Sequence, residues 1–425
     1  MSHREFGIGG GKFDMRHGFG RLRSARITVR TVAAAVLAVS VMVSAGCGSD
    51  SQPAQEETVD LSKLDTGSFA TKPQDPTTSD PEKRGRLLEG LRLGNAVPLV
   101  SDIDPSLSYN PDSTLVFIEP NSFGGHLNVD HFADDTKGFI AGFATSGRPS
   151  EDPALGYTLT NAIMTFDSEA AATSAATALA HTGFALRGSP EVDPLQSSQH
   201  PAAQIIWAPT EQRLASWFPT GKLLIFSMID QAENYSVEQT FGVATEPAPL
   251  DLVDKAINVT TDRLKTFQPT PPDKLAGLPL DTDGMLRLTL PRPAGDPTAN
   301  AFTGVLDQHG ALHMVNKPIK YRELFDKTGT DLVSYGAVVL VRTRDTASAQ
   351  TFLDTTSTSR FLHRIDPPTG LPTARCSKYK GPDEHAAPFA CYVSYGRYVA
   401  TVWSQQQQDL YQRTSAQYAI LASGK

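Results

Sequence analysis

A proline-rich stretch near the middle of the chain limits every fold that this sequence could adopt. Residues 268–274 read Gln-Pro-Thr-Pro-Pro-Asp-Lys. Proline lacks a backbone N–H and biases the residue before it toward an extended conformation, so neither a helix nor a central strand can cross this stretch. A chain of 425 residues is also longer than one hydrophobic core of ordinary size requires. We therefore predict two domains, over residues 61–270 and 275–425.

The same order of elements is predicted on both sides of this stretch. The first half offers a strand, a helix and three further strands at 162–166, 167–181, 204–207, 214–218 and 223–228. The second half offers the same series at 337–341, 343–353, 376–380, 389–394 and 398–403. A helix with an apolar face closes each half. Chance similarity of short strands is the alternative, but we favour an α+β fold of two similar domains produced by internal duplication, each an antiparallel sheet with helices packed on one face.

The first 46 residues are typical of a lipoprotein signal peptide rather than of a folded domain. Five arginines between residues 16 and 30 precede an apolar run at 32–43, which is too short to span a bilayer and suits a signal-peptide core. The residues Val-Ser-Ala-Gly then lead into Cys47, as in a bacterial lipobox, where the cysteine thiol receives a diacylglycerol. An uncleaved signal anchor is the alternative. Either Met1 or Met15 could be the start of translation.

Residues 47–60 lack an apolar period and are predicted to form a flexible tether. A lipid on Cys47 would hold the protein on the outer face of the cytoplasmic membrane, in the cell envelope. Pairing of Cys376 with Cys391 is expected in that oxidising compartment, across neighbouring strands. The signal peptide holds seven basic and two acidic residues, so the remaining chain carries a net charge of −13. We therefore expect no nucleic-acid partner.

The densest group of possible metal ligands lies at residues 124–135. Among them, His126, Asp130 and His131 are residue types that bind Zn²⁺ and other divalent ions. Their spacing matches no established metal motif, so a solvated loop is the preferred interpretation and no cofactor is expected. His309 and His313 lack the glutamate of a His-Glu-x-x-His motif. The alternation over residues 311–315 predicts a strand with His313 as an ordinary surface residue.

Several segments resemble an uncharacterised family of actinobacterial two-domain lipoproteins. They are Phe-Ala-Cys-Tyr-Val-Ser-Tyr-Gly-Arg-Tyr-Val-Ala at 389–400, Gln412 with Ala-Gln-Tyr-Ala-Ile-Leu at 416–421, and Gly-Tyr-Thr-Leu-Thr-Asn-Ala at 156–162. The resemblance spans most of the chain after the signal peptide and implies a surface lipoprotein of unknown function, with no functional residues to carry over. The disulfide-bearing end also resembles, more locally, extracellular sensor domains of actinobacterial receptor kinases, which are thought to bind ligands.

These observations predict a membrane-anchored, non-catalytic protein of the cell envelope that binds a ligand or another protein. The membrane would be reached through the lipid anchor, and the further partner would be a small molecule, a lipid or an envelope protein. The cleft between the two domains is the natural place for a ligand. A cell-envelope hydrolase that uses carboxylates or the 126–135 stretch is the alternative from a different class. Lipid transport is a third hypothesis.

Overall fold

The computed structural model describes residues 59–111, 115–119, 123, 125–242, 247–293, 303–382 and 387–424. The predicted signal peptide, both possible start residues, Cys47 and the tether before residue 59 lie outside these residues. Within the described ranges, no helix has the length and the apolar character that crossing a membrane requires.

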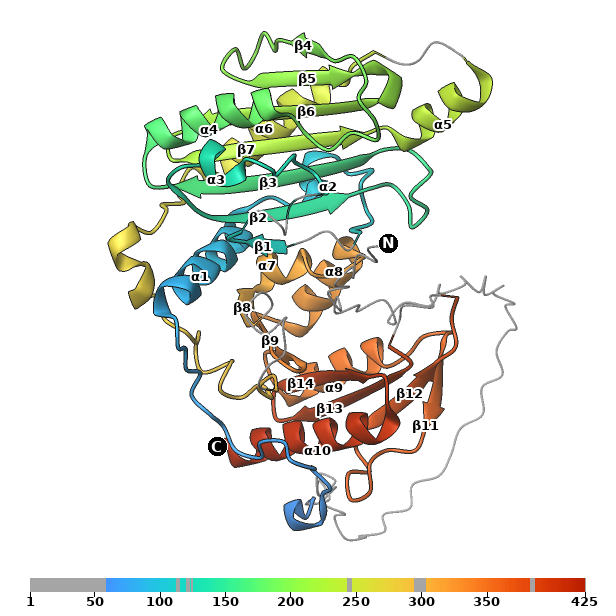
Figure 1. Cartoon of the computed structure of the whole chain (residues 1–425). Coiled ribbons are helices and arrows are strands. Elements are labelled where there is room, and N and C mark those ends of the chain that lie inside the picture. The colour runs from blue at the N-terminus through green and yellow to red at the C-terminus, as the bar shows by residue number, and fades with distance from the viewer. Residues whose placement is uncertain are drawn as a thin grey trace, which may run out of the picture.

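Two antiparallel sheets of seven strands each make up the body of the described chain (Figure 1). The strands of the first sheet are β1 (Leu115–Phe117), β2 (Phe139–Gly147), β3 (Thr158–Phe166), β4 (Asp193–Leu195), β5 (Gln204–Ala208), β6 (Arg213–Thr220) and β7 (Leu223–Asp230). Those of the second sheet are β8 (Gly304–Asp307), β9 (Leu332–Tyr335), β10 (Val339–Arg342), β11 (Leu362–Ile365), β12 (Arg375–Tyr379), β13 (Phe389–Tyr395) and β14 (Tyr398–Ser404). The N-terminal domain is the part of the chain built around the first sheet, and the C-terminal domain is the part built around the second.

The two sheets share one topology. Their strand orders are β1-β2-β3-β7-β6-β5-β4 and β8-β9-β10-β14-β13-β12-β11, so each strand of one sheet has a counterpart in the same place in the other. The central hairpins β6–β7 and β13–β14 turn at Gly221 and Gly396, and both glycines have the positive φ that such tight turns require. The predicted α+β fold of two similar domains is therefore confirmed.

Ten helices and three short 3₁₀ turns accompany the strands in the described ranges. The helices are α1 (Pro81–Ala96), α2 (Val100–Ile103), α3 (Phe132–Asp135), α4 (Glu169–Thr182), α5 (Ala232–Phe241), α6 (Leu250–Leu264), α7 (Gln308–Leu312), α8 (Pro318–Thr328), α9 (Thr346–Thr356) and α10 (Gln407–Ser423). The 3₁₀ turns are η1 (Leu61–Lys63), η3 (Pro209–Glu211) and η4 (Pro272–Gly277). The helices α4 and α9 begin at Glu169 and Thr346, two and three residues after the predicted starts, because Ser168 and Asp345 cap their first turns.

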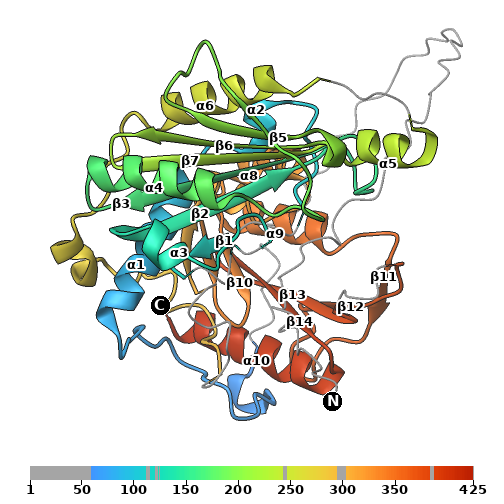
Figure 2. The ribbon, with the colours of Figure 1, turned by 45° about the horizontal axis from the view of Figure 1, so that its top comes forward.

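The helices cover both faces of each sheet, and not the single face that the sequence predicted. Helices α3 and α4 pack on one face of the N-terminal sheet, while α1, α2 and α6 pack on the other (Figure 2). In the C-terminal domain, α7, α8 and α9 cover one face and α10 covers the opposite one. The reason is visible in β3, where Met164 joins one core and its neighbour Ile163 joins the other. A sheet whose strands are apolar on both sides has no face to leave in water.

The disulfide joins β12 to β13. Cys376 and Cys391 are direct cross-strand partners, with Cα atoms 4.1 Å apart, and both are buried against the core beneath α10. The bridge therefore lies where the sequence placed it. At the matching place in the N-terminal sheet, counted from the shared hairpin, Ile205 stands opposite Ser216. The fold thus accepts two different pairs at this position.

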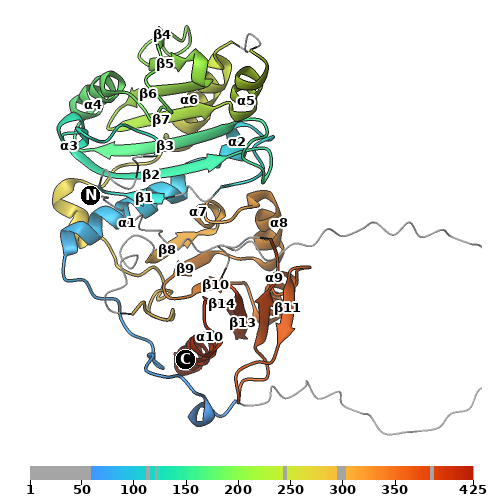
Figure 3. The ribbon, with the colours of Figure 1, turned by 45° about the vertical axis from the view of Figure 1, so that its right-hand side comes forward.

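Residues 59–75, which we call the strap, run along the C-terminal domain before the chain enters α1 (Figures 1 and 3). The carboxylate of Asp65 accepts hydrogen bonds from Gln408 (2.7 Å) and Gln412 (3.1 Å) of α10. Leu64 and Phe69 pack against the apolar cluster that α10 covers. The sequence assigned most of this segment to the N-terminal domain, whereas its contacts lie with the C-terminal domain.

Candidate functional site at the domain junction

Helix α1 lies between the two sheets and packs on both domains (Figure 3). Gly94 faces β2 so closely that a Cβ atom would lie 2.5 Å from the ring of Phe143. Leu91 packs toward the C-terminal domain, and the side-chain oxygen of Asn95 accepts a hydrogen bond of 3.2 Å from the N–H of Asp307. One helix therefore belongs to the cores of both domains, which holds the domains together through buried contacts.

Two histidines of the C-terminal domain meet one backbone carbonyl of the N-terminal domain. The Nε2 atoms of His309 and His313 lie 2.7 and 3.1 Å from the carbonyl oxygen of Val97, at the end of α1. The Nδ1 atom of His313 lies 3.0 Å from the hydroxyl of Thr145 on β2. The side chain of His313 is completely buried. This pair fastens the C-terminal end of α1 to α7.

The partners of these rings determine their tautomers. A carbonyl oxygen only accepts, so both histidines donate to Val97 through Nε2–H, and Nδ1 of His313 accepts from the hydroxyl of Thr145. Burial lowers the pKa of His309 and lowers the pKa of His313 well below its usual value. Both rings are therefore neutral at pH 7 and act as hydrogen-bonding groups of the junction.

The prediction of a strand at residues 311–315 with a surface His313 was wrong. The carboxylate of Asp307 accepts a hydrogen bond of 2.7 Å from the N–H of Gly310 and begins helix α7 in place of the strand. The helical turn then directs His313 inward. Asp307 followed by Gln308 was the available signal, because an Asp that ends a short apolar run is a common helix N-cap.

Polar contacts continue along the same junction beyond the histidines. The N–H of Asn110 donates to the carbonyl oxygen of Asn316 (2.8 Å), and the side-chain amide of Asn316 donates to the hydroxyl of Tyr109 (3.1 Å). Arg322 of α8 forms an ion pair of 3.0 Å with Asp102 of α2. Along α7 and α8, hydrogen bonds and an ion pair thus connect the two domains across the junction where the sequence predicted a ligand.

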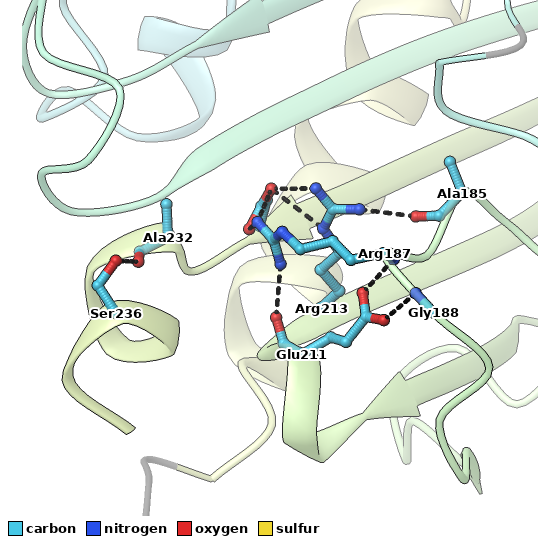
Figure 4. Close-up of polar contacts among 8 residues, drawn as sticks. Ala185, Arg187, Gly188, Glu211, Arg213, Ala232 and Ser236 are labelled. Carbon is cyan, nitrogen blue, oxygen red and sulfur yellow. Dashed lines mark hydrogen bonds and ion pairs between the residues drawn. The ribbon is translucent and has the colours of Figure 1, made fainter. Parts of the chain in front are cut away.

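A second polar cluster lies at the end of β7 (Figure 4). Arg187 and Arg213 both bind the carboxylate of Asp230, at 3.0 and 2.7 Å. The carboxylate of Glu211 accepts hydrogen bonds from the backbone N–H groups of Arg187 (2.6 Å) and Gly188 (2.8 Å). Two cations and two anions therefore balance each other within the cluster. The contacts of this cluster join η3, β6, β7 and the segment that follows α4. We therefore assign the cluster a structural role.

Helix α5 follows this cluster and rests on the surface of the N-terminal domain. None of its ten residues is buried. Its first turn is held by Glu233, whose carboxylate accepts a hydrogen bond of 2.6 Å from the N–H of Gly156. Val237 and Phe241, four residues apart, are 43% and 73% exposed. The helix therefore presents apolar side chains to solvent on one side.

The three weak metal candidates do not form a site. The ring of His126 packs against that of Phe123, with centroids 5.0 Å apart. The N–H of Asp130 donates to the side chain of Asn128, and His131 stands at the start of α3 without a capping hydrogen bond from its side chain. Within the described ranges, no three His, Cys, Asp or Glu side chains are grouped as metal ligands. The hydrolase hypothesis gains no support from this stretch.

Comparison with known proteins identified two family models that cover most of the chain. The model described as the N-terminal domain of unknown function DUF7373 matches residues 76–280, and the C-terminal model of the same name matches residues 285–424. No curated protein matches the sequence. Among solved structures, the extracellular domain of PknH from Mycobacterium tuberculosis is similar, with 10% identity and a TM-score of 0.25. That match covers 40% of this chain and 95% of the PknH domain.

Proposed function

Since the chain belongs to the DUF7373 family and carries both of its domains, whose function is unknown, we propose a binding role on the cell surface. In this proposal, the protein is anchored by a lipid on Cys47 to the outer face of the cytoplasmic membrane. Its N-terminal domain binds another protein of the cell envelope, without catalysis. The family membership agrees with the predicted resemblance to a two-domain family of unknown function.

The anchoring part of the proposal is supported by the signal peptide pattern and by the buried disulfide of the C-terminal domain. Disulfides persist in oxidising compartments outside the cytoplasm. A Cys47→Ser variant should move from the membrane fraction to the soluble fraction, because the thiol that receives the lipid is removed. Membrane retention of this variant would refute a lipid on Cys47 as the attachment.

The binding part rests on helix α5. Isolated helices of ten residues are marginal in water, and most helices gain their stability by burying an apolar face. Helix α5 buries none of its residues and leaves Val237 and Phe241 in solvent. A protein that covers this face would supply the missing burial. The net charge of −13 after the signal peptide favours a partner that has basic residues around an apolar contact.

Site-specific crosslinking in intact cells tests this binding surface. A photo-crosslinking residue at position 241 should give an adduct of one mass, whereas the same residue at Ile319 should not. Ile319 is a matched control, because it is an apolar residue of α8 with 41% exposure. Excess purified protein should compete for the adduct, and a Val237→Ser competitor should compete less. Equal labelling from both positions, or competition that Val237→Ser leaves unchanged, would refute binding through α5.

A further inference from the structure

Arg84 is buried at the domain junction, in the N-terminal half of α1. Only 8% of its surface is exposed. Its Nη2 atom would lie 3.9 Å from a Cβ atom on Gly304, the first residue of β8. The guanidinium therefore extends from α1 of the N-terminal domain to the edge strand of the C-terminal sheet, at the junction of the two domains.

The charge of Arg84 has no counterpart in the described part of the chain. No hydrogen bond or ion pair joins the side chain of Arg84 to another described residue, and burial alone lowers the pKa of its guanidinium. Moving a guanidinium from water into a protein interior is unfavourable unless a partner compensates its charge. A buried arginine without such a partner is therefore expensive for the fold.

Arg342 is a second buried arginine, and it differs from Arg84 because carboxylates compensate its charge. It is also 8% exposed. Its guanidinium binds both carboxylate oxygens of Asp331, at 2.7 and 2.8 Å, and a carboxylate oxygen of Asp283 at 3.1 Å. These hydrogen bonds raise its pKa. Two carboxylates thus compensate one buried arginine, while Arg84, at equal burial, has none.

A second donor without a partner belongs to the same region. Tyr335 is the cross-strand partner of Gly304, so its side chain lies on the same face of the sheet as the Cα–Cβ direction of Gly304. Arg84 lies on this face as well. Tyr335 is buried, and its hydroxyl has no hydrogen-bond partner among the described residues. Burial raises the pKa of this hydroxyl, which therefore stays protonated and able to donate.

We propose that the region between α1 and the β8–β9 pair binds an oxyanion group, a carboxylate or a phosphate, with Arg84 as its counter-charge and Tyr335 as a further donor. The guanidinium presents its N–H groups in a planar fork that fits both kinds of oxyanion. Arg84 keeps 8% of its surface exposed, and we infer that a small ion enters along this side. Residues of both domains form the site, so a bound anion stabilises the packed arrangement of the domains. The proposal depends neither on the lipid anchor nor on α5.

Thermal unfolding of the full-length protein, purified in a non-ionic detergent, tests the site. Inorganic phosphate and acetate are titrated separately, with chloride keeping the ionic strength constant. At a tenfold excess over the dissociation constant, the ion that binds should raise the Tm by about 2–4 °C in a saturable manner. The ion that produces the rise shows whether the site takes a phosphate or a carboxylate group.

The variants separate site binding from the general effect of salts on stability. Arg84→Gln should abolish the saturable rise, and Tyr335→Phe should weaken the apparent affinity severalfold. Arg342→Gln should lower the starting Tm but keep the rise, because its carboxylate partners lie away from the proposed site. If Arg84→Gln does not fold, Arg84→Lys keeps the charge and loses the planar fork, so it should bind with reduced affinity. An equal rise in the wild type and in the Arg84 variant, or no rise in the wild type with either ion, would overturn the proposal.

Discussion

Acidification is expected to weaken the domain junction, because both junction histidines are neutral in the folded protein. Burial lowers the pKa of both rings, and the pKa of His313 is lowered further by His309 and by the charges of Arg263 and Arg322. In the unfolded chain, each ring titrates near pH 6.5. Below that pH, the unfolded state binds more protons than the folded state. The contribution of these rings to stability is therefore fully present above pH 6.5 and is lost as the pH falls.

The size of this effect follows from the number of buried rings. A histidine that stays neutral in the folded state lowers the free energy of unfolding by at most about 1.4 kcal/mol per pH unit below its unfolded pKa. Over the interval from pH 6.5 to 5.5, the loss is about 1 kcal/mol for one ring. His313, whose pKa is lowered well below its usual value, should therefore cost about 1 kcal/mol over this interval, and His309, whose pKa is also lowered, adds a further loss of the same sign.

Urea unfolding at pH 7.5, 6.5 and 5.5 measures this loss. A His313→Gln variant removes the titration of this ring while its side-chain amide can still donate to Val97, so about 1 kcal/mol of the loss should disappear. His363→Gln, at an exposed position of β11, should leave the loss unchanged. The reasoning fails if the wild type keeps its stability from pH 6.5 to 5.5, or if His313→Gln loses as much stability as the wild type.

Two further predictions concern the disulfide and the packing of α1. Replacing Cys376 and Cys391 by alanine should lower the free energy of unfolding by about 3 kcal/mol, because the bridge closes a loop with a sequence separation of 15. Urea unfolding measures this loss, and a variant as stable as the oxidised wild type would contradict it. Gly94→Ala should cost about 1–3 kcal/mol through overpacking against Phe143, which is more than the helix gains from alanine. Gly277→Ala, with open space around its position, is the control and should stay within about 0.5 kcal/mol of the wild type in the same assay.

The repeated fold could be predicted because its signals are local. The strand that begins near Leu223 and the strand that begins near Tyr398 each follow a two-residue turn that starts with glycine. Ser168 and Asp345 mark the helices that follow β3 and β10. Such turns and caps act over three or four residues, so they can be read without knowledge of the rest of the chain.

The junction could not be predicted because its contacts connect distant parts of the chain. His313 is buried by Thr145 and Val97, which lie 168 and 216 positions away. Arg84 belongs to a helix with several charged residues, and only the position of β8 shows that this arginine is the one turned inward. The strap carries no apolar period that could have predicted its position. Its hydrogen bonds with α10 come from a single side chain, Asp65, which no local pattern marks.

The strap also determines how the molecule bears a mechanical load. The chain enters the described body beside α10 of the C-terminal domain and only then rises to α1 (Figure 1). The domain that comes last in the sequence is thus the one next to the point of entry. We expect a pull on the N-terminus to load the packing of Val59 and Leu64 on the C-terminal core and the hydrogen bonds between Asp65 and α10 before it reaches α1. Tension on the leading segment should therefore act on the C-terminal domain before it acts on the packing between the two domains.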